Sequence, residues 1–162
     1  MIRKFSFAFL MLMLGWLGAA APARAQGAPP ESDKAKEVVA LVDRAAAALD
    51  AKGKSAFPEF RQANGPWRSG DLYLLVVDLE GMELFNAAFP QFEGTDVTLL
   101  KDPDGRSIGD LFVSKVKSAG VGWVDYLWPK PGQTANSRKW TYVKAATVDG
   151  VPALVGAGFY PD

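Results

Sequence analysis

The amino-acid sequence predicts an α+β domain: one five-stranded antiparallel sheet, with a long N-terminal helix on one face and a loop-helix insertion over the other. Three features predict this fold. A helical apolar repeat runs through residues 33–51, and two apolar runs at 72–77 and 82–86 follow it as a hairpin. Three further apolar runs close the chain, and Asp149-Gly150, a dipeptide typical of two-residue hairpin turns, joins the last two. Strands joined by such short connections pair antiparallel, so one sheet can hold all five.

Residues 1–25 are predicted to be a signal peptide. Two basic residues precede residues 5–17, which are almost continuously apolar. Ala23 and Ala25 then provide the small side chains that a signal peptidase requires, so we expect cleavage after Ala25 and a periplasmic or secreted protein. A retained membrane anchor is the alternative, although the apolar run is shorter than the roughly 20 residues that span a bilayer.

The long helix follows a short linker. Residues 26–34 are expected to contain the linker and the helix start, and residues 35–160 to form a single domain. Ser32 or Asp33 can cap the first free amides of the helix, and apolar side chains then recur at helical spacing. A shorter helical segment with Pro58 in its first turn is expected next.

The rest of the chain is expected to consist of an insertion and three strands. Residues 87–106 contain several Pro and Gly residues and are predicted to form a long structured loop, and residues 107–119 carry apolar side chains at helical spacing. Strands are expected at 122–128, 139–148 and 151–160. A loop of this length within a compact domain is usually functional, which makes the insertion a candidate cover for a binding site.

The composition excludes most catalytic and metal chemistry. The 162 residues include no cysteine and no histidine, which removes disulfide partners, thiol catalysis, the usual general base and the commonest transition-metal ligand. The segment 101–105 lacks the first and twelfth ligands of a calcium loop, so a tight Asp-Gly turn is expected there. Basic residues are no more numerous than acidic ones and form no stripe, so nucleic acid is not an expected partner. We therefore expect no enzyme activity, no metal and no cofactor.

The closing strands predict which side chains share a face of the sheet. A two-residue turn at 149–150 places Tyr142 opposite Ala157, and a symmetric loop before residue 139 would place Tyr126 opposite Tyr142. One face would then carry a set of aromatic and basic side chains: Tyr126, Trp128, Trp140, Tyr142 and Lys144. The opposite, glycine-containing face would receive the long helix. The aromatic face fits either a pocket for a small anionic ligand or ordinary core, and the spacing alone leaves both interpretations open.

An ordered set of short motifs covers nearly all of residues 35–160. The motifs are Gly70-Asp71-Leu72-Tyr73, Asp78-x-x-Gly81, Phe89-Pro90-x-Phe92-x-Gly94, Lys101-Asp102-x-Asp104-Gly105, GWVDYLWPKP at 122–131, Lys139-x-x-Tyr142-Val143-Lys144 and Gly158-Phe159-Tyr160. In this order they resemble a single Cache domain, type 2-like, of the bacterial extracytoplasmic sensor and ligand-binding family. No single motif is specific, and the resemblance depends on the ordered set.

The resemblance implies a PAS-like fold, with a pocket for a short organic acid or similar small metabolite between the sheet and the insertion. Carried over position by position, the candidate ligand-binding residues are Tyr126, Trp128, Lys139, Tyr142 and Lys144. Lys139 lies on the other face in the predicted register, where it could instead anchor the preceding loop.

The resemblance also suggests how the domain would signal. Such domains commonly lie outside a membrane helix that leads to a chemoreceptor or kinase. Here Tyr160 is followed by Pro161 and Asp162 alone. We therefore expect an exported small-molecule-binding domain without its own transmembrane output, acting through a membrane receptor, kinase or transporter. The alternative is a structural or partner-docking periplasmic module with no small-molecule ligand.

Overall fold

The computed structural model describes residues 27–29 and 31–161, so the predicted signal peptide and its cleavage point lie outside the described residues. The helices and strands within this range are α1 (Asp33–Lys52), a 3₁₀ turn η1 (Gly53–Ala56), α2 (Phe57–Arg61), β1 (Leu74–Asp78), β2 (Glu83–Asn86), a 3₁₀ turn η2 (Pro90–Phe92), α3 (Ile108–Ala119), β3 (Val121–Pro129), β4 (Asn136–Val148) and β5 (Val151–Phe159).

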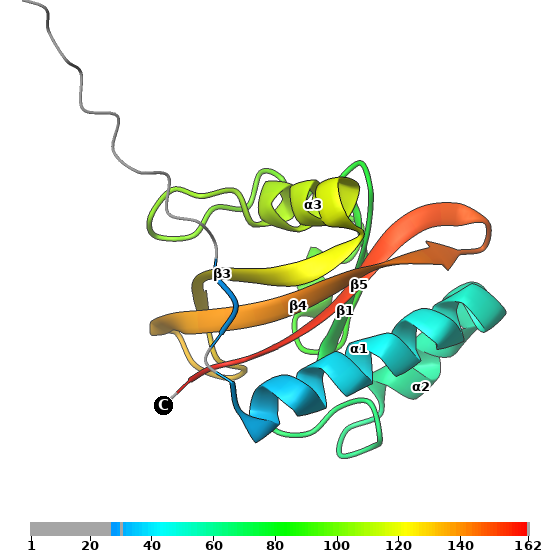
Figure 1. The fold of residues 1–162 in the computed structure, drawn as a ribbon, viewed down its shortest axis with the longest axis horizontal. Coiled ribbons are helices and arrows are strands. Elements are labelled where there is room, and N and C mark those ends of the chain that lie inside the picture. The colour runs from blue at the N-terminus through cyan, green and yellow to red at the C-terminus, as the bar shows by residue number, and fades with distance from the viewer. Residues whose placement is uncertain (1–26, 30, 162) are drawn as a thin grey trace, which may run out of the picture.

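The five strands form one antiparallel sheet, as predicted, and their order is β2-β1-β5-β4-β3 (Figure 1). The predicted register of β4 and β5 is confirmed, with Tyr142 opposite Ala157. Asp149 and Gly150 join these strands with φ values of 52° and 84°. Positive φ at both central residues is the requirement of the two-residue turn that Asp-Gly favours.

The helix α1 covers one face of the sheet, and α2 lies beside it (Figure 1). The hydroxyl of Ser32 caps α1 by accepting a hydrogen bond from the amide of Ala35 at 3.1 Å. The buried stripe of α1 and the inward side chains of β4 and β5 belong to one apolar cluster, which includes Val38, Val42, Leu49, Trp140, Val155 and Phe159. Burial of this stripe, more than helix propensity, holds α1 in place.

The register of β3 against β4 differs from the prediction by three residues. Tyr126 lies opposite Lys139 and not opposite Tyr142, because β3 continues to Pro129 and β4 already begins at Asn136. An odd shift moves every side chain of one strand to the other face relative to its neighbour. The prediction that α1 packs on the glycine-containing face is also wrong: α1 packs on the face that carries Tyr142.

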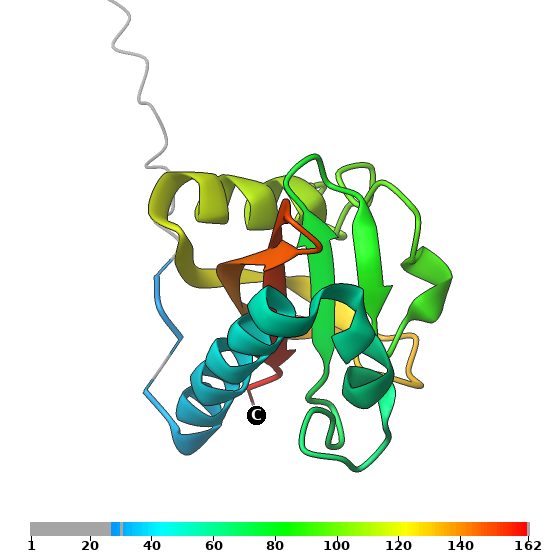
Figure 2. The same cartoon turned by 90° about the vertical axis from the view of Figure 1, so that its right-hand side faces the viewer.

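The insertion and α3 cover the glycine-containing face, and Figure 2 shows the chain passing from β2 to α3 on that side. The predicted tight turn is confirmed. The Asp102 carboxylate accepts hydrogen bonds from the backbone amides of Asp104 and Arg106 and from the Arg106 guanidinium. Arg106 also donates to the carbonyl oxygen of Asp125 in β3 at 3.0 Å, which attaches the insertion to the sheet.

Among residues 27–29 and 31–161, no helix combines the length and the apolar character needed to cross a membrane.

Candidate functional site

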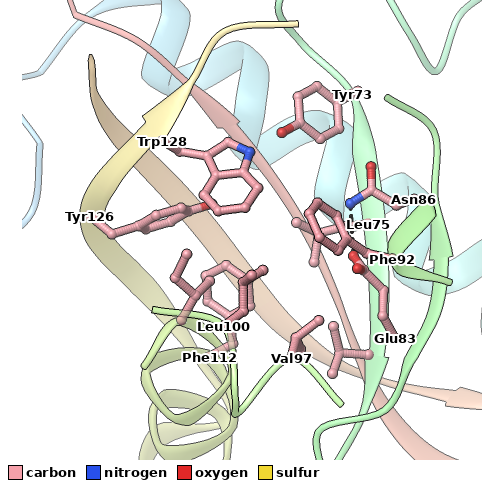
Figure 3. Close-up of a pocket in the computed structure, with 12 residues that line it drawn as sticks. Tyr73, Leu75, Glu83, Asn86, Phe92, Val97, Leu100, Phe112, Tyr126 and Trp128 are labelled. Carbon is pink, nitrogen blue, oxygen red and sulfur yellow. Dashed lines mark hydrogen bonds between the residues drawn. The ribbon is translucent and has the colours of Figure 1, made fainter. Parts of the chain in front are cut away.

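A small cavity lies between the sheet and the insertion, on the face opposite α1 (Figure 3). Its lining comes from β1, β2, β3, α3 and the insertion: Tyr73, Leu75, Val77, Glu83, Asn86, Phe92, Val97, Leu100, Ile108, Phe112, Tyr126 and Trp128. The space open to the centre of a water molecule is about 20 Å³. That space holds about one water molecule. Most of the lining is apolar, so its few polar groups determine what the cavity can bind.

Two hydrogen-bond donors face the same part of the cavity. Figure 3 shows the hydroxyl of Tyr73 and the indole nitrogen of Trp128 directed toward one another. Both rings pack edge-on against Phe89, with centroids 5.6 Å and 5.7 Å away, which fixes their orientation. The Tyr73 hydroxyl accepts a hydrogen bond from Lys139, and the hydroxyl of Tyr160 is a second polar neighbour of it. Among the described residues no hydrogen bond involves the indole nitrogen of Trp128, which lines the cavity, so this donor is available to a ligand.

Lys139 in β4 is fully buried behind Tyr73. Gly158 makes room for it, because a Cβ at that position would lie 2.8 Å from the Lys139 Cε. The Lys139 ammonium donates to the Tyr73 hydroxyl at 2.6 Å and lies 4.0 Å from the centre of that ring. Within the described chain no carboxylate lies within 4.0 Å of it. Burial lowers the pKa of Lys139 to about 7, against the opposing charges of Glu83 and Asp71.

Glu83 in β2 is a second buried charge, with 4% of its surface exposed. The Asn86 side-chain amide donates to one of its carboxylate oxygens at 2.8 Å. The side-chain oxygen Oδ1 of Asn86 in turn accepts hydrogen bonds from the backbone amides of Ala88 and Phe89, which fixes the Asn86 side chain. Burial raises the pKa of Glu83 to about 7, and the hydrogen bond from Asn86 opposes this shift.

Three of the five sequence-predicted residues lie at or beside the cavity. Tyr126 and Trp128 line it, and the Tyr126 hydroxyl lies 3.0 Å from the hydroxyl of Thr141. Burial raises the pKa of Tyr126, so its hydroxyl stays protonated. Lys139 lies on the same face as Tyr126, opposite it in the ladder, and not on the other face as predicted.

Tyr142 and Lys144 lie on the other side of the sheet, and the prediction that they share a face with Tyr126 is wrong. The ring of Tyr142 packs against Trp123 with centroids 5.1 Å apart, beside α1. Lys144 donates to the carboxylate of Asp43 in α1 at 2.7 Å. The three-residue error in the register of β3 and β4 accounts for both misplacements.

The sequence interpretation missed Tyr73, Glu83, Asn86 and Phe92. Tyr73 and Phe92 belong to the ordered motifs of the sequence, and that membership is the signal that points to them. Glu83 was harder to find, because simple alternation places it on the same face as Phe85. A β-bulge pairs Val76 with Phe85 but Val77 with Glu83, so Glu83 turns toward the cavity. The available signal was a charged residue in a short strand whose middle residues, Leu84 and Phe85, are apolar.

Residues 34–162 match the family model of the single Cache domain 2. The chain belongs to this family. A solved Cache chemosensory domain, studied for its recognition of carboxylic acids, is 29% identical with a TM-score of 0.67, covering 80% of this chain and 94% of that one. The periplasmic sensor domain of a chemotaxis protein is 32% identical with a TM-score of 0.61, covering 76% of this chain and 88% of that one.

A longer relative is the methyl-accepting chemotaxis protein McpP of Pseudomonas putida, 29% identical over 92 residues. The match covers 57% of this chain but 16% of that protein, so the chain corresponds to a small part of the receptor. Cache domains are extracytoplasmic sensor modules that bind ligands, and this chain has their PAS-like α+β fold.

Proposed function

We propose that the domain binds a short organic carboxylate in the cavity beneath the insertion. The observation that carries this proposal is Lys139, a fully buried cation that has a phenol and no carboxylate as its hydrogen-bond partner in the described chain. A buried charge without a counter-ion is costly, so an anion placed nearby would be strongly favoured. Carboxylic acid recognition by a similar Cache domain supports the same ligand class.

The proposed binding mode uses three groups. The Tyr73 hydroxyl and the Trp128 indole N–H would donate to the carboxylate, and Lys139 would supply positive charge through Tyr73. A hydroxyl that already accepts from an ammonium is a stronger donor, because the two hydrogen bonds polarise one another. Tyr126 and Phe112 would contact the rest of the ligand. Tyr142 and Lys144 have no part in this binding mode because they lie on the α1 face.

Calorimetric titration with acetate, propionate and pyruvate tests the proposal. Lys139→Met should weaken the affinity for these acids by about 10-fold to 100-fold, the effect of losing a charge-assisted interaction. Lys144→Met is the matched control: it removes a lysine of the same strand from the opposite face and should leave the affinity unchanged. If both variants bind the acids as wild type does, Lys139 is not the anion site. If wild type binds no acid, the partner-docking alternative is favoured.

We also propose that the domain works outside the cytoplasm after cleavage following Ala25, and that it passes ligand occupancy to a membrane receptor, kinase or transporter without chemically changing the ligand. The family's extracytoplasmic role and its occurrence in chemotaxis proteins support this. The intact mass of the protein from a periplasmic extract tests the cleavage point. Ligand-dependent cross-linking in intact cells tests the partner, and cross-links that do not depend on the ligand would argue against signalling.

A further inference from the structure

Glu83 gives the cavity a second polar end, which a simple carboxylate would not use. One of its oxygens is held by Asn86, and among the described residues no donor reaches the other oxygen. Every described side-chain nitrogen or oxygen that is sealed from solvent has a hydrogen-bond partner. The second oxygen of Glu83 therefore borders the open space of the cavity that Glu83 lines.

The position of this acceptor is fixed by its surroundings. The amide of Asn86 holds the carboxylate, and two backbone amides hold Asn86. The backbone of Glu83 is also fixed, because its amide donates to the carbonyl of Thr95 at 3.0 Å and its carbonyl accepts from the amide of Gly94 at 2.7 Å. In Figure 3, the Glu83 carboxylate lies beside Asn86, apart from the Tyr73 hydroxyl. A rigid, preorganised acceptor can select among ligands.

A ligand that fills the cavity displaces water from this oxygen. An aliphatic acid such as propionate would offer no donor in exchange, so the acceptor would lose a hydrogen bond on binding. A hydroxyl group would restore the bond. It can donate to the ionised carboxylate, and it can both donate to and accept from the protonated acid, so it suits either state of Glu83.

We propose that Glu83 is a specificity-determining residue that selects short hydroxycarboxylates over their deoxy analogues. In this arrangement the ligand carboxylate lies at Tyr73 and Trp128, and its hydroxyl group donates to the free oxygen of Glu83. The inference rests on the proposed function, because it requires that a carboxylate binds in this cavity.

Calorimetric titration of wild type with lactate, 3-hydroxypropionate and propionate tests the inference, since all three acids have the same number of carbon atoms. At least one hydroxy acid should bind about 10-fold to 100-fold more tightly than propionate, the gain expected from a hydrogen bond to a charged group. Glu83→Met should reduce this ratio to about one, and Glu83→Gln, which keeps an acceptor oxygen, should retain part of it. Tyr73→Phe should weaken the binding of all three acids and preserve the ratio of hydroxy-acid affinity to propionate affinity.

The outcomes separate the two proposals. Equal affinity of wild type for propionate and both hydroxy acids overturns the role of Glu83 and leaves carboxylate binding intact. The same conclusion follows if Glu83→Met, shown to be folded by its melting transition, keeps the preference. If no acid binds to wild type, the proposed function and this inference both fail.

Discussion

Two ionisable groups of opposite charge lie at one small cavity: Glu83 lines it, and Lys139 lies behind Tyr73. Each has a pKa near 7, because burial disfavours the charged form of both. A buried ionisable group lowers the stability of the ligand-free protein, because its charged form is poorly solvated. Groups with pKa values shifted in this way are typical of functional sites. Substitutions that remove these charged groups are therefore expected to stabilise the ligand-free protein and to weaken ligand binding.

Glu83→Gln should stabilise the ligand-free domain increasingly as the pH rises from about 5 to about 8. The pKa of Glu83 is raised from 4.5 to about 7 in the folded state, so between these values the folded state binds more protons than the unfolded state. The contribution of Glu83 to the free energy of unfolding consequently falls as the pH rises through this window. Above this pH window the buried, ionised Glu83 lowers the free energy of unfolding by about 1–3 kcal/mol. Glutamine carries no charge and avoids this loss. Thermal melts of both proteins across the pH range check this, and parallel curves would contradict it.

Some residues of this site could be predicted from the sequence, but the face of the sheet and the burial of each side chain could not. The aromatic stretch at 122–131 correctly indicated Tyr126 and Trp128 as residues beneath the insertion. Lys139 was selected by motif position, but its burial depends on Gly158 in the neighbouring strand. Glu83 could not be placed by alternation, because the bulge in β2 depends on how the strands pair and has no clear signal in a strand of four residues.

At the scale of elements, the prediction succeeded where a turn has a strong sequence signal. Asp149-Gly150 specified the register of β4 and β5, and the order of helices and strands followed from apolar periodicity. The connection between β3 and β4 contains Gly132 but no comparable dipeptide. The exact residues at which those strands end were therefore not determined, and a shift of three residues exchanged the faces.

The two glycines of β5 should differ in their tolerance of alanine. A Cβ at Gly158 would lie 2.4 Å from the carbonyl oxygen of Trp140 and 2.8 Å from the Lys139 Cε, whereas the nearest atom to a Cβ at Gly156 is 3.1 Å away. Gly158→Ala should lower the free energy of unfolding by about 1–3 kcal/mol and weaken carboxylate binding by displacing Lys139. Gly156→Ala is the matched control, and it should reduce both the free energy of unfolding and the carboxylate affinity by less. Urea denaturation and calorimetric titration check this, and equal effects would show that packing around Lys139 is not tight.

The Asp102 turn should be a main support of the insertion. The Asp102 side chain is fully buried, and hydrogen bonds from Arg106 and from the backbone more than offset burial, holding its pKa below the usual value. Asp102→Asn should lower the free energy of unfolding by about 1–3 kcal/mol, because an amide cannot satisfy the same donors. Asp104→Asn, in the same turn but with a side chain 64% exposed, should change it by less than about 0.5 kcal/mol. Comparable losses in the two variants would contradict this account.

At the scale of the whole molecule, the sheet separates two layers with different tasks. The α1 layer is closely packed and contributes no residue to the cavity lining. The insertion layer is attached by Arg106, which donates to the carbonyl oxygen of Asp125, and by Glu93, which accepts from Arg61 of α2 at 2.6 Å. Backbone hydrogen bonds also join Gly94 and Thr95 to Glu83. Outside these attachments the insertion can yield when a ligand enters, whereas the strands are held by their ladders.

Hydrogen exchange should locate this response. The cavity holds about one water molecule, and even acetate is larger, so binding requires the lining to rearrange. Phe92, in the turn η2 and packed against Trp128 with centroids 5.8 Å apart, is the lining residue best placed to move. Saturating lactate or acetate should slow amide exchange in residues 87–101 and in β3, because the ligand fixes their packing, while α1 exchanges as before. Lys139→Met at the same ligand concentration should show weaker protection in these residues, because its affinity for the acid is lower. Protection in α1 without protection in the insertion would show that the ligand binds on the other face of the sheet.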